Sequence, residues 1–484
     1  MTRLPVRLVK LAMLVGLGVL AGCSYPLRNQ VATVVGDRHG YQLEKLAPDD
    51  MPETLVIVTA SGGGTRATAL ALSVLRGLDK VSLPNGHSLA QEIDVLSSVS
   101  GGSVTAGYFA LTGRDGFDTL EHEFVRKNGM STLLSAGLNP VGLAKLASPG
   151  TERIDLLIDY LNRQLFHGAT FATLIKNRRR PLLVLNAADM VEGTPFAFSQ
   201  RNFDLLCSDL PSLPLATAVA ASAAFPVVLS PVTLKNYEPC AATEKLANWP
   251  PPWVEAARDN PWYADPRRTS RGRVENSYAL GDKAPPGEKK LYIHLLDGGI
   301  ADNLGIAAPF RMLGENGANP PLFQDIDTGR ITKLIFVVVN ARSFKTSELD
   351  ESQATPGMFD MLMASLNAPI DRTTAGMASQ LRDLLLEQFR QMRLGDPVHQ
   401  ARFRHLAANT ALISIDFDAI ADPSCRHKFH EIPTSWTLKR EQVDGLLEMG
   451  MALLGNDPAF NDALGILGAQ RPNLPTVKEA CSTL

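Results

Sequence analysis

No apolar run in this chain of 484 residues reaches the roughly 18 positions that suggest a membrane-spanning helix, which excludes a polytopic membrane protein. An excess of basic residues is also missing, since 47 Lys and Arg stand against 50 Asp and Glu and the formal net charge is -3. This balance argues against a nucleic-acid-binding protein, which usually carries a basic footprint. Apolar residues make up 45% of the chain, so there is ample apolar surface for a core and disorder is not the main state.

Cysteine is scarce as well, and its five positions are Cys23, Cys207, Cys240, Cys425 and Cys481. If Cys23 is modified, as argued below, four thiols remain in an oxidising compartment. Four cysteines allow two disulfides in three connectivities. The sequence does not choose among these pairings, and buried thiols without disulfides are an equal alternative.

The first 22 residues have the layout of a secretory signal. A basic start is followed by the uncharged apolar stretch 11–20 and by two small residues directly before Cys23. This stretch resembles a bacterial lipobox, which implies that residues 1–22 are removed and that Cys23 carries acyl chains anchoring the protein in a membrane. Ser24 then implies the outer membrane, with the periplasmic and the surface face both open. The alternative is an ordinary signal peptide with an incidental cysteine.

Residues 23–52 are polar and mixed, and we interpret them as a tether between the lipid and a folded domain. Apolar, β-branched runs separated by helical segments follow, which indicates a buried, mostly parallel sheet with helices on both faces. The predicted strands are 55–60, 93–99, 182–187, 291–296 and 334–340, with 411–417 as an additional candidate. We therefore predict one α/β domain over 53–342 and a mostly helical C-terminal extension over 343–484.

One long stretch, residues 236–290, interrupts this α/β pattern. It contains three of the four tryptophans, Trp249, Trp253 and Trp262, together with three consecutive prolines and many charges. A segment of this length without secondary structure of its own is usually functional or disordered. We interpret it as an insertion near the mouth of a site, either a lid or a surface loop pinned by its aromatic side chains.

The sequence around Ser100 predicts a nucleophile at a tight turn. Ser100 follows the predicted strand 93–99, and Gly101 and Gly102 open a helix of small residues. A serine at such a turn is held in a strained conformation with its hydroxyl exposed. The helix start directs backbone N–H groups and a positive dipole end toward it. Taken alone the match is weak, because turns of this composition are common in α/β proteins.

A run of three glycines, Gly62, Gly63 and Gly64, lies between another predicted strand and helix. Its open N–H groups fit either a phosphate cradle or an oxyanion hole. The spacings of the known phosphate-binding motifs are absent, which favours the oxyanion hole. Arg66 sits in the first helical turn, where the dipole disfavours a cation. We therefore expect an anionic partner for it, either a structural carboxylate or a substrate phosphate.

Asp297 is the predicted base. It precedes Gly298 and Gly299 directly after the strand 291–296, and ligand sites of open α/β sheets lie at the carboxyl ends of strands. The glycine run and Ser100 also follow strands, so all three motifs are expected at one edge. No histidine follows an obvious core strand, and His294 points to the opposite face from Asp297. A carboxylate acting directly on Ser100 is the simpler interpretation.

Together these motifs resemble those of the patatin-like phospholipases. Members of this family combine a glycine-rich oxyanion stretch, a G-x-S-x-G nucleophile and a D-G-[GA] aspartate in a Ser-Asp dyad without histidine. The same order occurs here over about residues 55–342, and 221–226 is similar to the family's A-S-x-A-x-P segment. The chain departs from the family pattern at Ser61, Ala67 and Ser98.

The resemblance implies a three-layer α/β/α fold, makes 53–342 the catalytic domain and assigns roles residue by residue. Ser100 is the expected nucleophile and Asp297 the expected base, and the amides of the three glycines are the expected oxyanion hole. The implied positions that support the motifs are Arg66, Gly101, Gly102, Gly298 and Gly299.

The activity implied by the resemblance is hydrolysis of acyl esters of phospholipids or lysophospholipids at the bacterial envelope. The scheme needs no metal or other cofactor, and no nucleic acid or particular protein partner is implied. The alternative is a non-catalytic envelope lipoprotein that binds lipid or a protein. Cys425, His427 and His430 have a spacing that zinc ligands also show, but no convincing fourth ligand follows. The preferred interpretation of that segment is a polar loop, in which a disulfide of Cys425 is one option.

Overall fold

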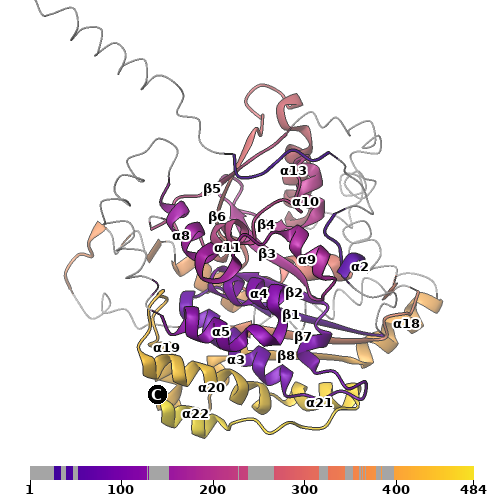
Figure 1. Ribbon diagram of the computed structural model, residues 1–484, viewed down its shortest axis with the longest axis vertical. Coiled ribbons are helices and arrows are strands. Elements are labelled where there is room, and N and C mark those ends of the chain that lie inside the picture. Colours follow the sequence, from indigo (N-terminus) through magenta and orange to yellow (C-terminus); the bar gives the residue numbers. More distant parts are fainter. Residues whose placement is uncertain are drawn as a thin grey trace, which may run out of the picture.

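The computed structural model of the chain has a mixed eight-stranded sheet at its centre, surrounded by helices (Figure 1). This is the three-layer α/β architecture expected from the sequence. The residues that the structure describes are 27–33, 40–46, 53–127, 129, 152–226, 228–237, 266–314, 325–326, 328–343, 353–358, 361, 364–365, 367–377, 383 and 397–484.

The strands occur where the apolar runs predict them, with two additions. In chain order they are β1 (Thr54–Ala60), β2 (Val95–Val99), β3 (Leu182–Asp189), β4 (Pro195–Phe198), β5 (Val232–Lys235), β6 (Tyr292–Asp297), β7 (Lys333–Asn340) and β8 (Thr410–Asp416). Their order in the sheet is β5-β6-β3-β2-β1-β7-β8, and β4 pairs with β3. The candidate strand near 411–417 is confirmed as β8. The additions, β4 and β5, have only four residues each, too few to show a pattern.

The sheet has a parallel part and an antiparallel part. Strands β3, β2, β1, β7 and β8 are parallel to their neighbours in that series. Strand β6 runs antiparallel to both β3 and β5, and β4 runs antiparallel to β3. The sequence-based prediction of a common edge assumed that the strand before Asp297 is parallel to the others. In the structure this strand, β6, is antiparallel to its neighbours.

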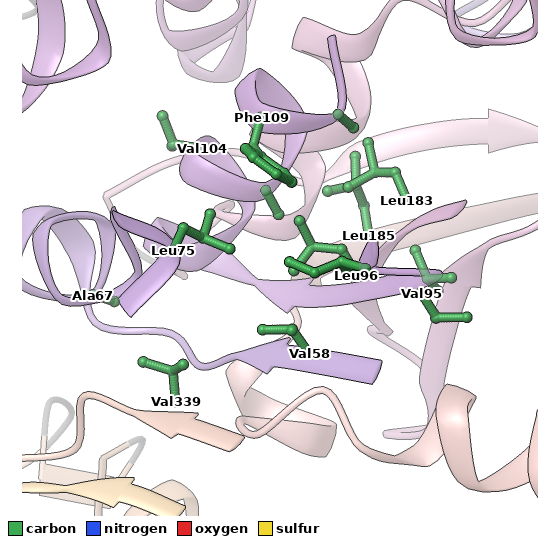
Figure 2. Close-up of a cluster of buried hydrophobic side chains, with 14 of the residues drawn as sticks. Val58, Ala67, Leu75, Val95, Leu96, Val104, Phe109, Leu183, Leu185 and Val339 are labelled. Carbon is green, nitrogen blue, oxygen red and sulfur yellow. The ribbon is translucent and has the colours of Figure 1, made fainter. Parts of the chain in front are cut away.

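Helices α3 (Gly64–Asp79) and α4 (Ser100–Thr112) pack side by side on one face of the sheet. Side chains such as Val58, Leu96 and Val339 meet them in a continuous apolar layer (Figure 2). Phe336 lies three positions before Val339 on β7 and so points to the other face. There its ring packs on Phe310 of α15 (Ala307–Gly314), with the ring centroids 5.8 Å apart.

The remaining α-helices with described bounds surround this core. They are α2 (Leu43–Leu46), α5 (Phe117–Leu120), α8 (Arg153–Leu161), α9 (Phe171–Asn177), α10 (Gln200–Leu205), α11 (Leu215–Ser222), α13 (Pro266–Leu280), α14 (Gly299–Asp302), α18 (Pro397–Ala408), α19 (Pro423–His430), α20 (Arg440–Asn456), α21 (Pro458–Leu467) and α22 (Val477–Thr483). Among the described residues, no helix combines the length and the apolar character needed to cross a bilayer.

The described residues before β1 belong to the domain, which differs from the predicted tether over 23–52. Tyr41 and Leu43 are 2% and 1% exposed, and the Tyr41 hydroxyl accepts a hydrogen bond from the N–H of Leu183 on β3 at 2.8 Å. The polar composition of this stretch concealed these few apolar residues. The predicted signal 1–22 and Cys23 lie outside the described residues.

The second half of the insertion 236–290 is helical rather than loop-like. Tyr278, in the last turn of helix α13, is 3% exposed. The side chain of Asn236 donates to the carbonyls of Tyr278 and Lys290 at 2.7 and 2.9 Å, so the insertion is closed at its base. Its three tryptophans lie outside the described residues, and the lid interpretation stays a prediction.

The C-terminal extension completes the domain instead of standing beside it. Strand β8 forms the edge of the sheet next to β7, and α20 packs along α3. The hydroxyl of Ser73 on α3 donates to the carbonyl of Leu447 at 2.6 Å and accepts from the N–H of Met451 at 3.0 Å. The C-terminal third therefore contributes to the core that supports the site.

Candidate active site

Ser100 stands at the turn from β2 to α4 with a positive φ of 51°, a conformation that is strained for a residue with a β-carbon. The two glycines after it permit the close approach of the neighbouring loop. A β-carbon on Gly101 would lie 2.0 Å from the carbonyl oxygen of Gly64, and one on Gly102 would lie 2.6 Å from that of Ser61. The serine turn and the glycine turn are therefore packed directly on each other.

The hydroxyl of Ser100 donates a hydrogen bond to Oδ2 of Asp297 at 2.7 Å. Both residues are 6% exposed. The other carboxylate oxygen, Oδ1, accepts from the N–H of Gly299 at 2.8 Å. Burial raises the pKa of the Asp297 carboxyl to about 6, although the hydrogen bonds from Gly299 and Ser100 work in the opposite direction. The site thus holds a serine hydroxyl against a poorly solvated carboxylate.

The antiparallel course of β6 explains how Asp297 reaches Ser100. Strand β6 runs antiparallel to β3 and pairs only with the carboxyl end of β3, over three residue pairs. The last of these pairs joins Asp297, at the end of β6, to Ala187. The preceding residue of β3, Asn186, pairs with Val99, next to Ser100. Gly298 passes so close to β3 that a β-carbon there would lie 2.2 Å from the carbonyl oxygen of Asn186. Partial overlap therefore brings the end of an antiparallel strand to the same edge.

Ser222 is a site residue to which the sequence analysis assigned no role. Its hydroxyl accepts a hydrogen bond from the N–H of Ser100 at 3.0 Å and donates to the carbonyl of Asn186 at 2.6 Å. Its own carbonyl accepts from the N–H of Gly298 at 3.1 Å. Ser222 thus joins the serine turn to the aspartate turn. The available signal was its place in the segment 221–226.

Ser98 stands where a glycine is usual, and the structure accommodates its hydroxyl. The Ser103 hydroxyl donates to that of Ser98 at 3.1 Å and lies 2.9 Å from that of Ser222. All three side chains are fully buried. The departure at Ser98 therefore adds a bonded hydroxyl beneath the turn and leaves the Ser100 side chain in place.

The three glycines of the other turn are not equivalent. The N–H of Gly62 donates to the carbonyl of Asn303 at 3.2 Å, which differs from its predicted role as an oxyanion donor. Gly63 and Gly64 have positive φ values of 141° and 59°, and within the described residues their N–H groups have no acceptor. These two amides are the open donors beside the serine turn.

Residues 432–435, which we term the C-terminal strap, hold the glycine turn from outside. The N–H of Thr65 donates to the carbonyl of Ser435 at 2.8 Å. Arg66 donates to the carbonyls of Ala341 and Ile432 at 2.7 and 2.6 Å, and to the Thr434 hydroxyl at 2.9 Å. The strap and the end of β7 thus fix the first turn of α3.

The partners of Arg66 differ from the expected anion. The hydrogen bonds of Arg66 described above go to neutral oxygen atoms, and the charge of Asp371 acts on the guanidinium from farther away. Burial lowers the pKa of the guanidinium to about 10, and Asp371 counteracts part of this effect. Because this pKa is well above 7, Arg66 remains charged at neutral pH. Its side chain is 3% exposed, and its hydrogen bonds join the first turn of α3 to the end of β7 and to the strap.

A family model for patatin-like phospholipases matches residues 58–310, which is more than half of the chain. The chain belongs to the patatin-like phospholipase family. The matched range contains the glycine turn, Ser100 and Asp297. This family assignment places the protein among the lipid acyl hydrolases.

Comparison with other known proteins adds little beyond the family. The structure is similar to that of human GIVD cytosolic phospholipase A2, with a TM-score of 0.41 and 11% identity. The similarity covers 96% of this patatin-like chain and 67% of the human one. A search of curated protein sequences found no match.

Histidine takes no part in the described contacts of the patatin-like dyad. Ring atom Nδ1 of His294 lies 2.9 Å from the Thr233 hydroxyl, on the strand pair β5–β6. Ring atom Nε2 of His430 lies 3.0 Å from Asp418. Within the described part of the chain, the side-chain contacts of Asp297 are with Ser100 and Gly299. The geometry is that of a serine and a carboxylate in direct contact.

The segment considered for zinc contains a disulfide in this patatin-like chain. Cys425 and Cys481 are bonded to each other, which is one of the options that the sequence left open, whereas the expected polar loop is the helix α19. A bonded Cys425 has no thiolate to offer a metal, and no group of three metal-ligating side chains occurs among the described residues. Cys207 is buried, whereas Cys240 lies outside the described residues.

Proposed function

We propose that this protein is a serine acyl hydrolase that cleaves acyl esters of phospholipids or lysophospholipids through Ser100 and Asp297. The observation that carries the proposal is the 2.7 Å hydrogen bond from the Ser100 hydroxyl to Asp297 Oδ2. Two further features support it. Ser100 is held at a strained turn, and the pKa of Asp297 is raised to about 6, which improves a carboxylate as a base near neutral pH.

The reaction begins when Ser100 Oγ attacks the ester carbonyl carbon and its proton passes to Asp297 Oδ2. The N–H groups of Gly63 and Gly64 stabilise the negative charge that develops on the carbonyl oxygen. Collapse of this intermediate releases the lipid alcohol, which takes the proton from Asp297 and leaves an acyl group on Ser100. Water then attacks the acyl-enzyme and gives a proton to Asp297. Release of the fatty acid returns that proton to Ser100, and every step uses protein groups and water only.

We further propose that the enzyme acts at the bacterial outer membrane, anchored through acyl chains on Cys23. The support is the sequence pattern of a basic start, an apolar stretch and small residues before this cysteine. An anchor of this kind would raise the effective concentration of the site at its substrate surface. Metabolic labelling with palmitate tests the anchor, since label should enter the wild type and be absent from Cys23→Ser.

The test of the dyad is labelling of the purified protein by a fluorophosphonate probe. We expect labelling of the wild type, none in Ser100→Ala and a sharp decrease in Asp297→Asn. Asp302→Asn is the matched control, because Asp302 is a buried carboxylate at the end of α14, five residues after Asp297, and accepts from the N–H groups of Gly305 and Ala307. A folded wild type that takes no label contradicts the proposal. A panel of phospholipids and lysophospholipids then identifies the substrate.

A further inference from the structure

The N-terminal segment, residues 27–33, is fixed along strand β5. The side chain of Asn29 donates to the carbonyl of Lys235 at 2.8 Å and accepts from its N–H at 2.9 Å. It also donates to the Ser208 hydroxyl at 2.9 Å, and the Tyr237 hydroxyl donates to the carbonyl of Asn29 at 2.6 Å. Asn29 is 3% exposed, so the segment is part of the folded domain.

Arg28 fixes the start of the N-terminal segment to helix α8. Its guanidinium forms ion pairs with Asp155 at 2.5 Å and with Glu152 at 3.8 Å. Only five chain steps separate Arg28 from Cys23, and a fully extended chain covers at most about 18 Å over that length. Acyl chains on Cys23 would therefore hold this particular part of the domain close to the bilayer.

Exposed apolar side chains gather around the same part of the domain. Leu27 and Val31 lie on the N-terminal segment, Val228 lies in the loop before β5, and Leu291 and Tyr292 lie at the start of β6. Their exposed fractions are between 42% and 55%. An exposed cluster of this kind typically marks an interaction surface, whereas single exposed apolar residues need no explanation.

Hydrogen bonds connect the segments that carry these side chains. Lys235, which is bonded to Asn29, is the register partner of Tyr292 on β6. The N–H of Asn236 donates to the carbonyl of Leu291 at 2.9 Å. On the other side, the Ser230 hydroxyl, two residues after Val228, accepts from the N–H at the start of α8 at 3.1 Å, beside the partners of Arg28. The apolar residues thus lie on segments that are joined to each other.

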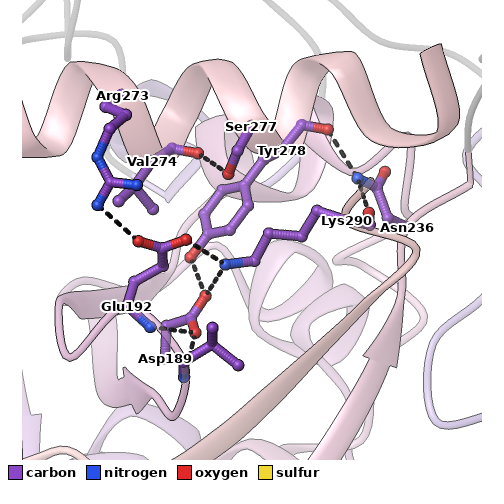
Figure 3. A network of polar contacts seen from close by, with 9 residues as sticks. Asp189, Glu192, Asn236, Arg273, Val274, Ser277, Tyr278 and Lys290 are labelled. Carbon is purple, nitrogen blue, oxygen red and sulfur yellow. Dashed lines mark hydrogen bonds and ion pairs between the residues drawn. The ribbon is translucent and has the colours of Figure 1, made fainter. Parts of the chain in front are cut away.

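The turn after β3 has its charges inside and its apolar residues outside. Lys290 forms ion pairs with Asp189 and Glu192 at 2.8 and 3.2 Å, and their side chains are 10%, 0% and 14% exposed (Figure 3). Met190 and Val191, between the two acids, are 47% and 70% exposed. Charged side chains are usually the exposed ones, and here they are the covered ones. The ion pairs instead support apolar residues next to β6, where the N–H of Met190 donates to the carbonyl of His294 at 2.8 Å.

We propose that these exposed apolar residues, from Leu27 to Tyr292, form a docking surface for the lipid bilayer that holds the protein's own acyl anchor. The proposal rests on the lipid attachment at Cys23 proposed above. A bilayer is the occupant because the short connection to Cys23 brings this surface to the membrane. The loop that carries Val228 begins just after Ala224, whose carbonyl accepts from the N–H of Asp297 at 3.0 Å. Docking therefore brings the membrane to the loop next to the dyad.

The first test compares two substrates with the full-length lipidated enzyme. Vesicles of phosphatidylethanolamine and phosphatidylglycerol report on docking, and a soluble butyrate ester reports on the dyad alone. Tyr292→Glu and Val228→Glu should reduce vesicle hydrolysis by more than about tenfold, because each places a charge where an exposed apolar side chain would enter the bilayer. Hydrolysis of the soluble ester should stay within about twofold. Met358→Glu is the matched control, because Met358 is an exposed apolar side chain, at 83%, and is not one of the residues that define the docking surface.

Loss of both activities to the same degree, or unchanged vesicle hydrolysis, overturns the docking surface. A second measurement does not need catalysis, which separates a failure of docking from a failure of the proposed function. Brominated phospholipids in the same vesicles should quench the tryptophan introduced by Tyr292→Trp, measured over the wild-type background. The tryptophan introduced by Lys478→Trp, on α22 at the opposite end of the molecule (Figure 1), should not be quenched. Equal quenching at both positions, or none at either, contradicts the proposal even if the enzyme is active.

Discussion

The guanidinium of Arg66 donates a hydrogen bond to the carbonyl of Ile432 across 366 positions of the chain. This contact ties the residue behind the glycine turn to the C-terminal strap. The N–H of Thr65 makes a parallel contact with Ser435. Because Gly63 and Gly64 precede these two residues directly, the direction of their N–H groups depends on a part of the chain outside the family match, which covers residues 58–310.

Arg66→Met should lower kcat by roughly ten- to a hundredfold with a much smaller change in KM, because misplaced oxyanion donors weaken binding of the transition state and not of the ester. The variant keeps an apolar stem of similar length but leaves two buried carbonyls without a donor. Thr434→Val is the matched control and should show a smaller loss, since it removes one acceptor only. Steady-state kinetics on a soluble ester measure both parameters. A folded Arg66→Met enzyme with the kcat of the wild type would show that the hydrogen bonds of Arg66 do not position the oxyanion donors.

The pH profile should reflect Asp297. The carboxylate must be ionised to accept the Ser100 proton, and its pKa is raised to about 6. Values of kcat/KM should therefore be constant above this pH and fall about tenfold for each pH unit below it. The measurement is a profile of kcat/KM with a soluble ester, on protein shown by circular dichroism to stay folded. A profile that stays flat down to the ordinary pKa of a carboxyl group argues against Asp297 as the base.

Asp297→Asn should stabilise the protein at neutral and alkaline pH while abolishing most of the activity. Burial raises the folded-state pKa from 3.8 to about 6, so the folded state binds this proton more tightly than the unfolded state. The stabilising contribution of the protonated group is complete below 3.8 and is lost as the pH rises through 6. Two pKa units correspond to about 3 kcal/mol.

Thermal unfolding of Asp297→Asn and wild type at several pH values measures this effect. The variant should have the higher Tm at about pH 8, and the difference should shrink at about pH 5, where the wild-type carboxyl is protonated. The amide oxygen can still accept from the N–H of Gly299, and the amide nitrogen can donate to the Ser100 hydroxyl, so both contacts keep a hydrogen bond. A Tm difference that is independent of pH would mean that Asp297 is not the group whose ionisation costs stability.

Ser222→Ala should slow the reaction of Ser100 without removing a catalytic atom. The change leaves the N–H of Ser100 without its acceptor and the carbonyl of Asn186 without its donor. A buried donor without a partner costs about 1–3 kcal/mol, and the strained turn loses a support. We expect a lower Tm and roughly tenfold slower fluorophosphonate labelling. Ser103→Ala, which removes a neighbouring hydroxyl that does not contact Ser100, should label at nearly the wild-type rate.

Breaking the disulfide should lower stability more than activity. Cys425 and Cys481 join α19 to α22 across 56 positions, and closing a loop of this size typically contributes about 2–4 kcal/mol. The double variant Cys425→Ala with Cys481→Ala should therefore unfold at lower denaturant concentration, as measured by urea titration. The dyad is not in contact with either cysteine, so kcat of the folded variant should be near that of the wild type. A variant as stable as the wild type would show that packing of the helices alone holds them.

Much of the fold was predictable because the core strands are continuous apolar runs. Strands β1, β2, β3, β6 and β7 appear within two residues of their predicted positions, and Ser100 and Asp297 meet as expected. The prediction that the three motifs lie at one edge of the sheet was correct for Ser100 and Asp297. Its assumption that β6 is parallel to its neighbours was wrong. The direction of β6 is not written in its own sequence, since the same apolar pattern fits a parallel or an antiparallel neighbour.

The roles of Gly62 and Ser222 were not predictable for a different reason. Which glycine N–H stays open depends on Asn303, and the support of Ser100 depends on a hydroxyl from α11, and both are distant in sequence. Long-range contacts of this kind leave no periodic pattern. The same holds for the C-terminal strap, which lacks regular structure and contacts the first turn of α3 through two backbone carbonyls and one hydroxyl, so no residue type identifies it.

The strap also has a consequence for when this enzyme first becomes active. The ribosome makes the chain from its N-terminus, so Ser100 and Asp297 exist well before residues 432–435 of the 484 have been added. Until then the glycine turn has no outer support and the oxyanion donors are not held in position. We therefore expect a chain that ends before the strap to hydrolyse acyl esters more slowly than the complete protein, because its oxyanion donors lack this support.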